Sequence, residues 1–408
     1  MVTPDPLAEV ERVFRAEHGR AVAGLTRVLG DLDRAEDAVA EAFTVAVATW
    51  PQRGVPPNPG GWVVTTARNR AVDRLRREAV GAAKLAEVAR LQHEPEPVEE
   101  GVVRDDQLRL LFTCCHPALA PAARVALTLR LVAGLTTAEI ARAALVPEAT
   151  VAARITRAKH KIRTARIPWR VPAEADLPGR WASVLAVVHA VGTEAHSPAA
   201  GAEVSRDDLL EEAVRLARLL LELRPADPEA TGLLALLLLT ASRRPARVAD
   251  GAPVPLDRQD RRSWSRPLVE EGQALVRDCL RWGRPGPYQL QAAIAAVHAD
   301  APTWAATDWS QVVALYDQLR VVAPSAVVEL NRAVAIAELD GPSVGLALVD
   351  RLDLDRSPVL HAVRADLLRR LGRDDEACAA YDAALERTAN AAEQADLRRR
   401  RAGLPGVS

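Results

Sequence analysis

Apolar residues recur with helical spacing along almost the whole chain, and no other feature restricts the possible folds as much. In residues 209–223 and 312–319 they fall at positions i, i+3, i+4 and i+7, which is the pattern of an amphipathic helix. The two-residue alternation of a strand is nearly absent. Clusters of Gly and Pro, such as those at 51–61 and 224–230, separate the periodic segments. The pattern predicts an all-α protein.

Composition excludes several classes of protein. The longest unbroken apolar run, Leu233–Leu239, has seven residues, whereas a membrane-spanning helix needs about 20. Hydrophobic residues make up 49% of the chain, which argues against disorder throughout. The first residues show neither the basic start nor the apolar core of a secretory signal. Four cysteines in 408 residues are too few for a disulfide framework. We therefore expect a cytoplasmic protein with no membrane segment.

Charge is distributed unevenly along the chain. Residues 1–170 carry a net charge of +5 and residues 171–408 carry −6, although the whole chain sums to only −1. A basic half beside an acidic half suggests a nucleic-acid-binding module joined to a module of another kind. We expect a first domain at 1–79, an acidic linker at 80–106, a second domain at 107–170 and a C-terminal domain at 171–408, called the tail below.

Residues 135–163 carry the strongest local signal. Thr137 is expected to cap a helix over about 138–144, Val146–Pro147 to form the turn, and a second helix to run from Glu148 to about Arg163. In that second helix one row of side chains is apolar and another is cationic. The apolar row contains Val151, Ile155, Ala158 and Ile162, and the cationic row contains Arg154, Arg157 and Lys161. This spacing is typical of a helix-turn-helix whose second helix enters a major groove.

Residues 62–77 are expected to form a second basic helix. Its expected apolar stripe is Val64, Ala67, Ala71 and Leu75, and the loop before it, 51–59, contains four prolines. A stiff loop beside a cationic helix could hold an unstacked base.

The tail contains an internal repeat. Between residues 364 and 386, small residues, a Gly and a Tyr follow the spacing of a tetratricopeptide unit. Partial copies include Tyr316 with Pro324 and Ala213 with Pro225. The sequence predicts a tetratricopeptide-like helical-repeat domain, with a generic helical bundle as the alternative.

Three segments together, DLDRAEDAVAEAF (31–43), NPGGWVVTTARNRAVDRLRR (58–77) and the helix-turn-helix, resemble bacterial RNA polymerase σ factors. The chain is similar to the extracytoplasmic-function group, which retains only σ domains 2 and 4. Segments such as LFTCCHPAL (111–119), DRQDRRSW (257–264) and ELNRAVA (329–335) resemble the subgroup with a fused tetratricopeptide-like domain. One departure is VGTEAHS (191–197), where only Glu194 of the expected stretch is kept.

The resemblance implies a promoter-specificity subunit and not an enzyme, with core RNA polymerase (its β′ and β subunits) and promoter DNA as partners. The implied contacts with β′ are Asp33, Asp37 and Glu41. The implied −10 element residues are Arg53, Asn58, Trp62, Arg68, Asn69, Arg70, Arg74 and Arg77. The implied −35 element residues are Thr150, Arg154, Arg157 and Lys161. The acidic linker would thread channels of the polymerase that are built for nucleic acid.

No catalytic residue, metal site or cofactor is predicted from this sequence. Cys114, Cys115 and His116 look like a metal-binding fragment, but no second ligand pair follows, so we expect buried cysteines near a helix end. Because the tail is acidic and the first half basic, we also expect an intramolecular contact between them, through 257–264 and 329–335. Two alternatives remain: a helix-turn-helix regulator that acts without polymerase, and a tetratricopeptide scaffold.

Overall fold

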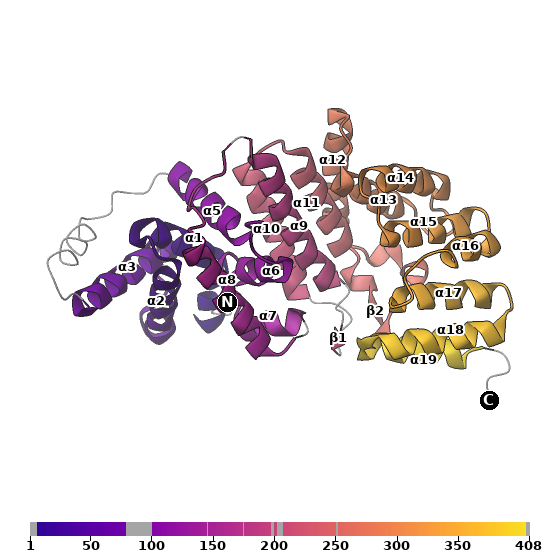
Figure 1. Ribbon diagram of the computed structural model, residues 1–408, viewed down its shortest axis with the longest axis horizontal. Helices are drawn as coiled ribbons and strands as arrows, with labels where there is room; N and C mark the ends of the chain where they lie inside the picture. Colours follow the sequence, from indigo (N-terminus) through magenta and orange to yellow (C-terminus); the bar gives the residue numbers. More distant parts are fainter. Residues whose placement is uncertain are drawn as a thin grey trace. The chain divides into compact units, whose positions relative to one another are not determined.

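A computed structural model describes residues 6–78, 100–144, 146–173, 175–196, 200–201, 207–249 and 252–404. Most of these residues are helical and very few are in strands, which confirms the predicted all-α class (Figure 1). They divide into two compact units. The first runs to Val187 without residues 143–145, and the second contains residues 143–145 and everything from Val188 onward. No described helix is long and apolar enough to cross a membrane.

The first unit begins with a three-helix group. Helices α1 (Pro6–Leu29), α2 (Leu32–Arg53) and α3 (Pro59–Glu78) pack against one another. Asp31 begins α2 by accepting hydrogen bonds from the backbone N–H groups of Asp33 and Arg34. The core between the three helices is built from aliphatic side chains, alanines and Phe43, together with Trp50 near the end of α2.

Four further helices follow in the same unit, except for the last two residues of α7: α5 (Glu100–Cys114), α6 (Pro121–Leu131), α7 (Thr137–Ala144) and α8 (Glu148–Thr164). Residues 100–106 of the expected acidic linker are the first turns of α5, and the rest of that predicted segment, 80–99, lies outside the described residues. Helix α5 packs on α1, and α8 packs on α6. Helix α9 (Leu177–His196) crosses from the first unit into the second.

The second unit is a series of helices in which chain neighbours pack on each other. They are α10 (Asp207–Leu223), α11 (Pro228–Ala241), α12 (Arg266–Trp282), α13 (Pro287–Asp300), α14 (Trp309–Val322), α15 (Ala326–Leu339), α16 (Pro342–Val349), α17 (Pro358–Arg370), α18 (Asp374–Arg387) and α19 (Ala391–Ala402). Contacts restricted mainly to neighbours are the mark of a helical-repeat array.

The predicted repeat corresponds to the hairpin of α17 and α18, which lie side by side in Figure 1. Ala365, Ala377, Tyr381 and Ala384 are all fully buried between these helices. Gly372 turns the chain with φ of +71°, a conformation that glycine adopts without strain. The tail is thus tetratricopeptide-like.

Short strands and turns complete the second unit. Strand β1 (Ala200–Gly201) pairs in parallel with β4 (Ala389–Asn390), which brings the first and last parts of this unit together. Strand β2 (Val248–Ala249) pairs antiparallel with β3 (Ala252–Pro253). Three single-turn 3-10 helices, η1 (Arg244–Ala246), η2 (Leu256–Arg258) and η3 (Arg261–Ser263), lie in the insertion before α12.

Candidate nucleic-acid interface

Helix α3 turns a polar, cationic face to solvent. Its buried stripe contains Val63, Ala67, Ala71 and Leu75. The expected Val64 is only partly buried, because the helix is rotated so that Val63 points into the core. Opposite this stripe, the predicted residues Asn69, Arg70, Arg74 and Arg77 are exposed and Arg68 is partly exposed. This face can contact phosphates along a nucleic-acid strand.

The loop before α3 is shorter than the sequence indicated. Helix α2 continues through Pro51 to Arg53, and α3 already begins at Pro59, so only residues 54–58 are loop. Asn58 begins α3 by accepting a hydrogen bond from Gly61 N–H at 2.9 Å. Trp62 is partly exposed, and its ring lies 5.2 Å from that of Trp50, edge to face. Arg53 is exposed beside this loop.

Helices α7 and α8 form the predicted helix-turn-helix, with one correction at its start. Thr136 caps α7, not Thr137: its hydroxyl accepts from Glu139 N–H at 3.1 Å, and the Glu139 carboxylate accepts from Thr136 N–H at 2.7 Å. In α8, Val151, Ile155 and Ala158 are buried as predicted.

The other face of α8 carries the four predicted −35 residues. Arg157 and Lys161 are exposed, and Thr150 and Arg154 are partly exposed. All four can therefore reach a partner.

Acidic residues of α2 contact cations from two other helices. Arg74 of α3 lies 3.1 Å from Asp37 and 3.8 Å from Glu41. In each pair both side chains are exposed to solvent, so each pair contributes little to stability. Asp33 contacts Lys159 at 2.7 Å and Arg163 at 3.5 Å, both from α8.

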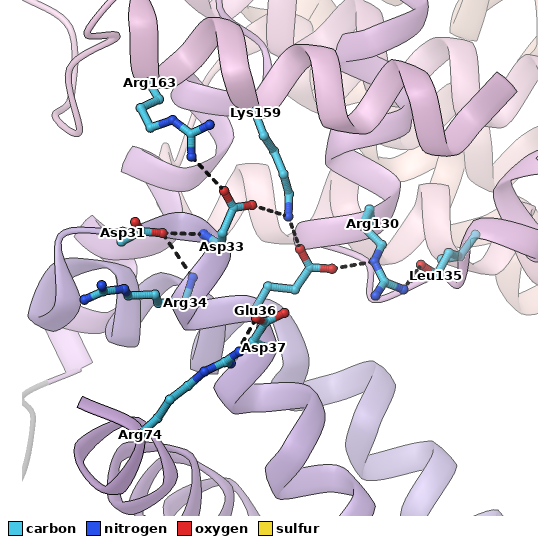
Figure 2. A network of polar contacts seen from close by, with 10 residues as sticks. All are labelled: Asp31, Asp33, Arg34, Glu36, Asp37, Arg74, Arg130, Leu135, Lys159 and Arg163. Carbon is cyan, nitrogen blue, oxygen red and sulfur yellow. Dashed lines mark hydrogen bonds and ion pairs between the residues drawn. The ribbon is translucent and has the colours of Figure 1, made fainter. Parts of the chain in front are cut away.

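Glu36, which no sequence pattern singled out, lies at the centre of this network (Figure 2). Only 6% of its surface is exposed. Its carboxylate accepts from Arg130 Nε of α6 at 2.5 Å and from Lys159 Nζ of α8 at 2.6 Å. Burial raises the pKa of Glu36, but the attraction of Lys159 and Arg130 outweighs it, and the net pKa is lowered. Glu36 is therefore held as a carboxylate.

Lys159 shows the complementary behaviour. Burial lowers its pKa, but Glu36 and Asp33 raise it by more, so the ammonium form is favoured. Lys159 is one of only three lysines among 53 basic residues, and it lies between the buried and the exposed rows of α8. That position is the one sequence feature that distinguishes Lys159, and it does not reveal that Glu36 and Asp33 are its partners.

A second buried carboxylate connects α5 to α1. Asp106, predicted to lie in the linker, is 2% exposed and accepts from Arg27 Nε at 2.8 Å and Arg109 Nη1 at 2.9 Å. Here burial has the larger effect, and the pKa of Asp106 is raised despite both arginines. The helices that carry the first and second predicted domains are thus joined at two charged contacts.

Cys114 and Cys115 are buried at the end of α5, as predicted. Burial raises the pKa of Cys115 to about 11 and that of Cys114 well above its usual value, so both are inert thiols near neutral pH. Cys115 Sγ lies 3.4 Å from Thr128 Oγ1.

Each of the two tail segments predicted to be contact surfaces has some side chains that are engaged within the second unit. Arg261 donates to the carbonyl oxygens of His298 and Ala301 at 2.7 and 2.8 Å. Trp264 is buried beneath the guanidinium groups of Arg243 and Arg261. Arg332 pairs with Asp317 at 2.7 Å. Within 257–264 the charged side chains of Asp257, Arg258, Asp260 and Arg262 are exposed, as is Asn331 in 329–335, and the contact of these segments with the first half of the chain stays a prediction.

Models of protein families match three parts of the chain. Residues 13–80 match sigma-70 region 2, and residues 109–162 match sigma-70 region 4. Residues 180–280 match a family of unknown function, DUF6596. The first two matches cover the three-helix group and the helix-turn-helix described above.

Similar proteins include an uncharacterized protein of Rhizobium meliloti (strain 1021), 44% identical over 388 residues, which cover 93% of this chain and 92% of that one. Among solved structures, a thermophilic TPR protein of Thermus thermophilus is 25% identical, with 48% of this chain and 91% of that chain covered and a TM-score of 0.33. The yeast Tom70 is 9% identical, with 98% and 86% covered and a TM-score of 0.37.

Proposed function

The chain belongs to the sigma-70 family, and we propose that it acts as an extracytoplasmic-function σ factor whose tail regulates it in cis. Sigma-70 regions 2 and 4 bind core RNA polymerase and promoter DNA, and both regions are present here. Region 2 comprises α1–α3, region 4 comprises α5–α8, and the helical-repeat tail follows. The polymerase would carry out the chemistry, and a protein that works with bacterial core polymerase would act in the cytoplasm.

The roles within region 2 follow from which side chains are exposed. Asp33, Asp37 and Glu41 lie on successive turns of α2 and form an acidic surface for the β′ subunit. Trp62 and the loop 54–58 would hold a flipped base of the −10 element. The −10 strand would be held by the polar face of α3, together with Arg53 and Asn58. The single observation that supports this most directly is that α3 buries its apolar stripe and exposes its cations.

Within region 4, Thr150, Arg154, Arg157 and Lys161 would read the −35 element through the major groove. A regulator that binds duplex DNA alone would not need region 2, so the match to region 2 disfavours that alternative.

The test is open-complex formation by the full-length chain with core polymerase. Arg70→Ala should reduce promoter melting at least about tenfold and leave core binding unchanged, since the loss is confined to strand contacts. Arg218→Ala, which removes an exposed arginine of the tail, is the matched control and should do neither. Equal melting by both variants would contradict the role given to α3.

A further inference from the structure

We propose that the tail carries a binding site for a small phosphate-bearing molecule, and that Arg243 is the residue that holds the phosphate. The site, called the Arg243 cluster, consists of Arg243 and Arg247 after α11, Arg261 and Trp264 in the insertion before α12, and His298 of α13. All five residues belong to the second unit. The inference concerns binding by the tail, so it goes beyond the proposed function and does not depend on it.

The two ends of the insertion before α12 meet beside Arg243. The Ser265 N–H, at the start of α12, donates to the Ser242 carbonyl, just after α11, at 2.8 Å. The guanidinium carbon of Arg243 lies 5.1 Å from the centre of the Trp264 ring, and that of Arg261 lies 5.5 Å from it. Two cations therefore contact one buried indole ring.

The charge of Arg243 has no anionic partner in the part of the chain that the structure describes. Its Nε is buried there without a hydrogen-bond partner, and none of the described carboxylates contacts its guanidinium. Burial and the neighbouring Arg247 and Arg261 lower the pKa of Arg243 to about 10, so it is still a cation at neutral pH. By contrast, Arg215 of the same tail contacts Glu212 at 2.6 Å.

The other contacts of the cluster are with neutral groups. Arg261 donates to the carbonyl oxygens of His298 and Ala301, and also to Thr307 Oγ1 at 3.1 Å. A cation–π contact with Trp264 returns less free energy than a buried guanidinium loses in hydration. Buried charges in proteins are normally paired. An anion bound at Arg243 would supply the missing pair.

The amount of positive charge favours a dianion. Arg247 and Arg261 both repel Arg243, and burial together with Arg243 and Arg261 lowers the pKa of His298 to about 3. A phosphate group carries a charge of about −1.5 to −2 at pH 7, so it offsets more of this repulsion than a carboxylate does. The guanidinium fork also matches two phosphate oxygens at once.

The surroundings of Arg243 favour a small ligand over a nucleic-acid strand. The side chain is only partly exposed, and its Nε is buried. Residues 171–408 carry a net charge of −6, which repels a long polyanion more than a single phosphate. The ligand we infer is therefore inorganic phosphate or a small phosphate ester.

The first test measures binding to the purified full-length chain by calorimetry, with inorganic phosphate and glycerol phosphate as the probes. Arg243→Met removes the guanidinium and keeps an unbranched stem against Trp264. Arg262→Met is the matched control, because Arg262 lies in the same insertion with its side chain 91% exposed. Arg243→Met should weaken binding at least about tenfold, since the fork and its charge are lost, and Arg262→Met should not change it. The probe that binds more tightly identifies the source of the phosphate.

Thermal unfolding separates a binding site from a purely structural arginine. A ligand that binds only the folded state raises the Tm. Phosphate at about 10 mM should raise the Tm of the unaltered chain above its value in acetate of equal ionic strength, and should not raise that of Arg243→Met. In acetate, Arg243→Met should melt no lower than the unaltered chain, because it removes a cation that no described carboxylate pairs with.

A second variant keeps the proposal testable if Arg243→Met folds poorly. Arg243→Lys retains the charge without the planar fork, so it should bind phosphate more weakly than the unaltered chain and more tightly than Arg243→Met. Equal phosphate affinity of all three chains would overturn the proposal. So would the absence of binding of either probe to the unaltered chain.

Discussion

Glu36 and Asp106 are both buried carboxylates paired with two cations each, yet their pKa values move in opposite directions. The pKa of Glu36 is lowered, because the pull of Lys159 and Arg130 exceeds the effect of burial. The pKa of Asp106 is raised, because burial exceeds the effect of Arg27 and Arg109. The two residues should therefore contribute to stability with opposite pH dependence.

For Glu36 the pH dependence of stability has the sign expected of a carboxylate whose pKa is lowered in the folded protein. Its stabilising contribution is present above the unfolded pKa, near 4.5, and is lost as pH falls through the lower folded pKa. Glu36→Gln should lower the free energy of unfolding by about 2 kcal/mol at pH 7, since it leaves the partly buried Lys159 with Asp33 as its carboxylate partner and removes the buried carboxylate that pairs with Arg130. The difference should shrink in acid. Urea unfolding at several pH values measures this.

Asp106→Asn is the matched comparison. Because the folded pKa is raised, ionised Asp106 opposes folding at neutral pH, and this cost disappears as pH falls below the unfolded pKa, near 3.8. Asp106→Asn should therefore destabilise less than Glu36→Gln at pH 7. A larger loss for Asp106→Asn would show that the arginine pairs outweigh burial after all.

Two cations on the exposed side of α8 should differ in what they read. Lys161→Ala should weaken binding to all duplexes alike and reduce the log–log salt slope by about 0.9, as expected for one phosphate contact. Arg154→Ala should instead relax preference at one base position, at a cost of about 1–3 kcal/mol, if its contact is bidentate. Binding titrations on specific and random duplexes at several salt concentrations separate the two. Identical effects would remove Arg154 as a base reader.

At the scale of elements, promoter melting is assigned to the loop and α3, not to the helix-turn-helix. Residues 55–57, Val-Pro-Pro, stiffen the loop and lower the entropy lost when a base pocket forms. Replacing 55–57 with Gly/Ser, while keeping Asn58 and Pro59 to begin α3, should abolish open complex on duplex promoter. A pre-melted bubble should restore it in part, because unstacking a base costs a few kcal/mol. Permanganate footprinting provides the measurement, and loss on both templates would point to misfolding.

Sequence periodicity predicted the helices well, but it predicted poorly which side chains of distant helices contact each other. The helices of both sigma regions and the tail hairpin follow from apolar spacing and turn residues, because both are local properties. Val63 takes the place of the expected Val64 in the core. Successive residues of a helix point about 100° apart, so the spacing to Ala67 allows either valine, and the packing partner decides between them. Glu36 was missed because its partners lie 94 and 123 residues away. No local pattern encodes a contact at that distance.

At the scale of the whole molecule, α9 determines where the chain can be cut. Trp181 is buried with its ring 6.2 Å from that of Phe112, and Arg180 donates to the Phe112 carbonyl at 3.2 Å. A cut after Arg170 would remove both and expose Phe112, which is otherwise buried. A chain ending at His196 should melt at a higher temperature than one ending at Arg170, as calorimetry would show.

The chain ending at His196 also tests regulation by the tail. If the tail controls activity in cis, this truncation should change transcription several-fold without unfolding regions 2 and 4. Unchanged rates on the same promoters would make the tail a separate binding module.

The most direct test of the central claim is transcription from a randomised promoter pool by core polymerase with the purified full-length chain, read by sequencing transcript starts. If the chain is a σ factor, transcripts should start at a fixed distance downstream of two shared sequence elements that are held at constant spacing. Enrichment should vanish when the chain is omitted. If the transcript starts do not differ from those of core polymerase alone, while the chain still binds duplex DNA by itself, the chain is not a σ factor.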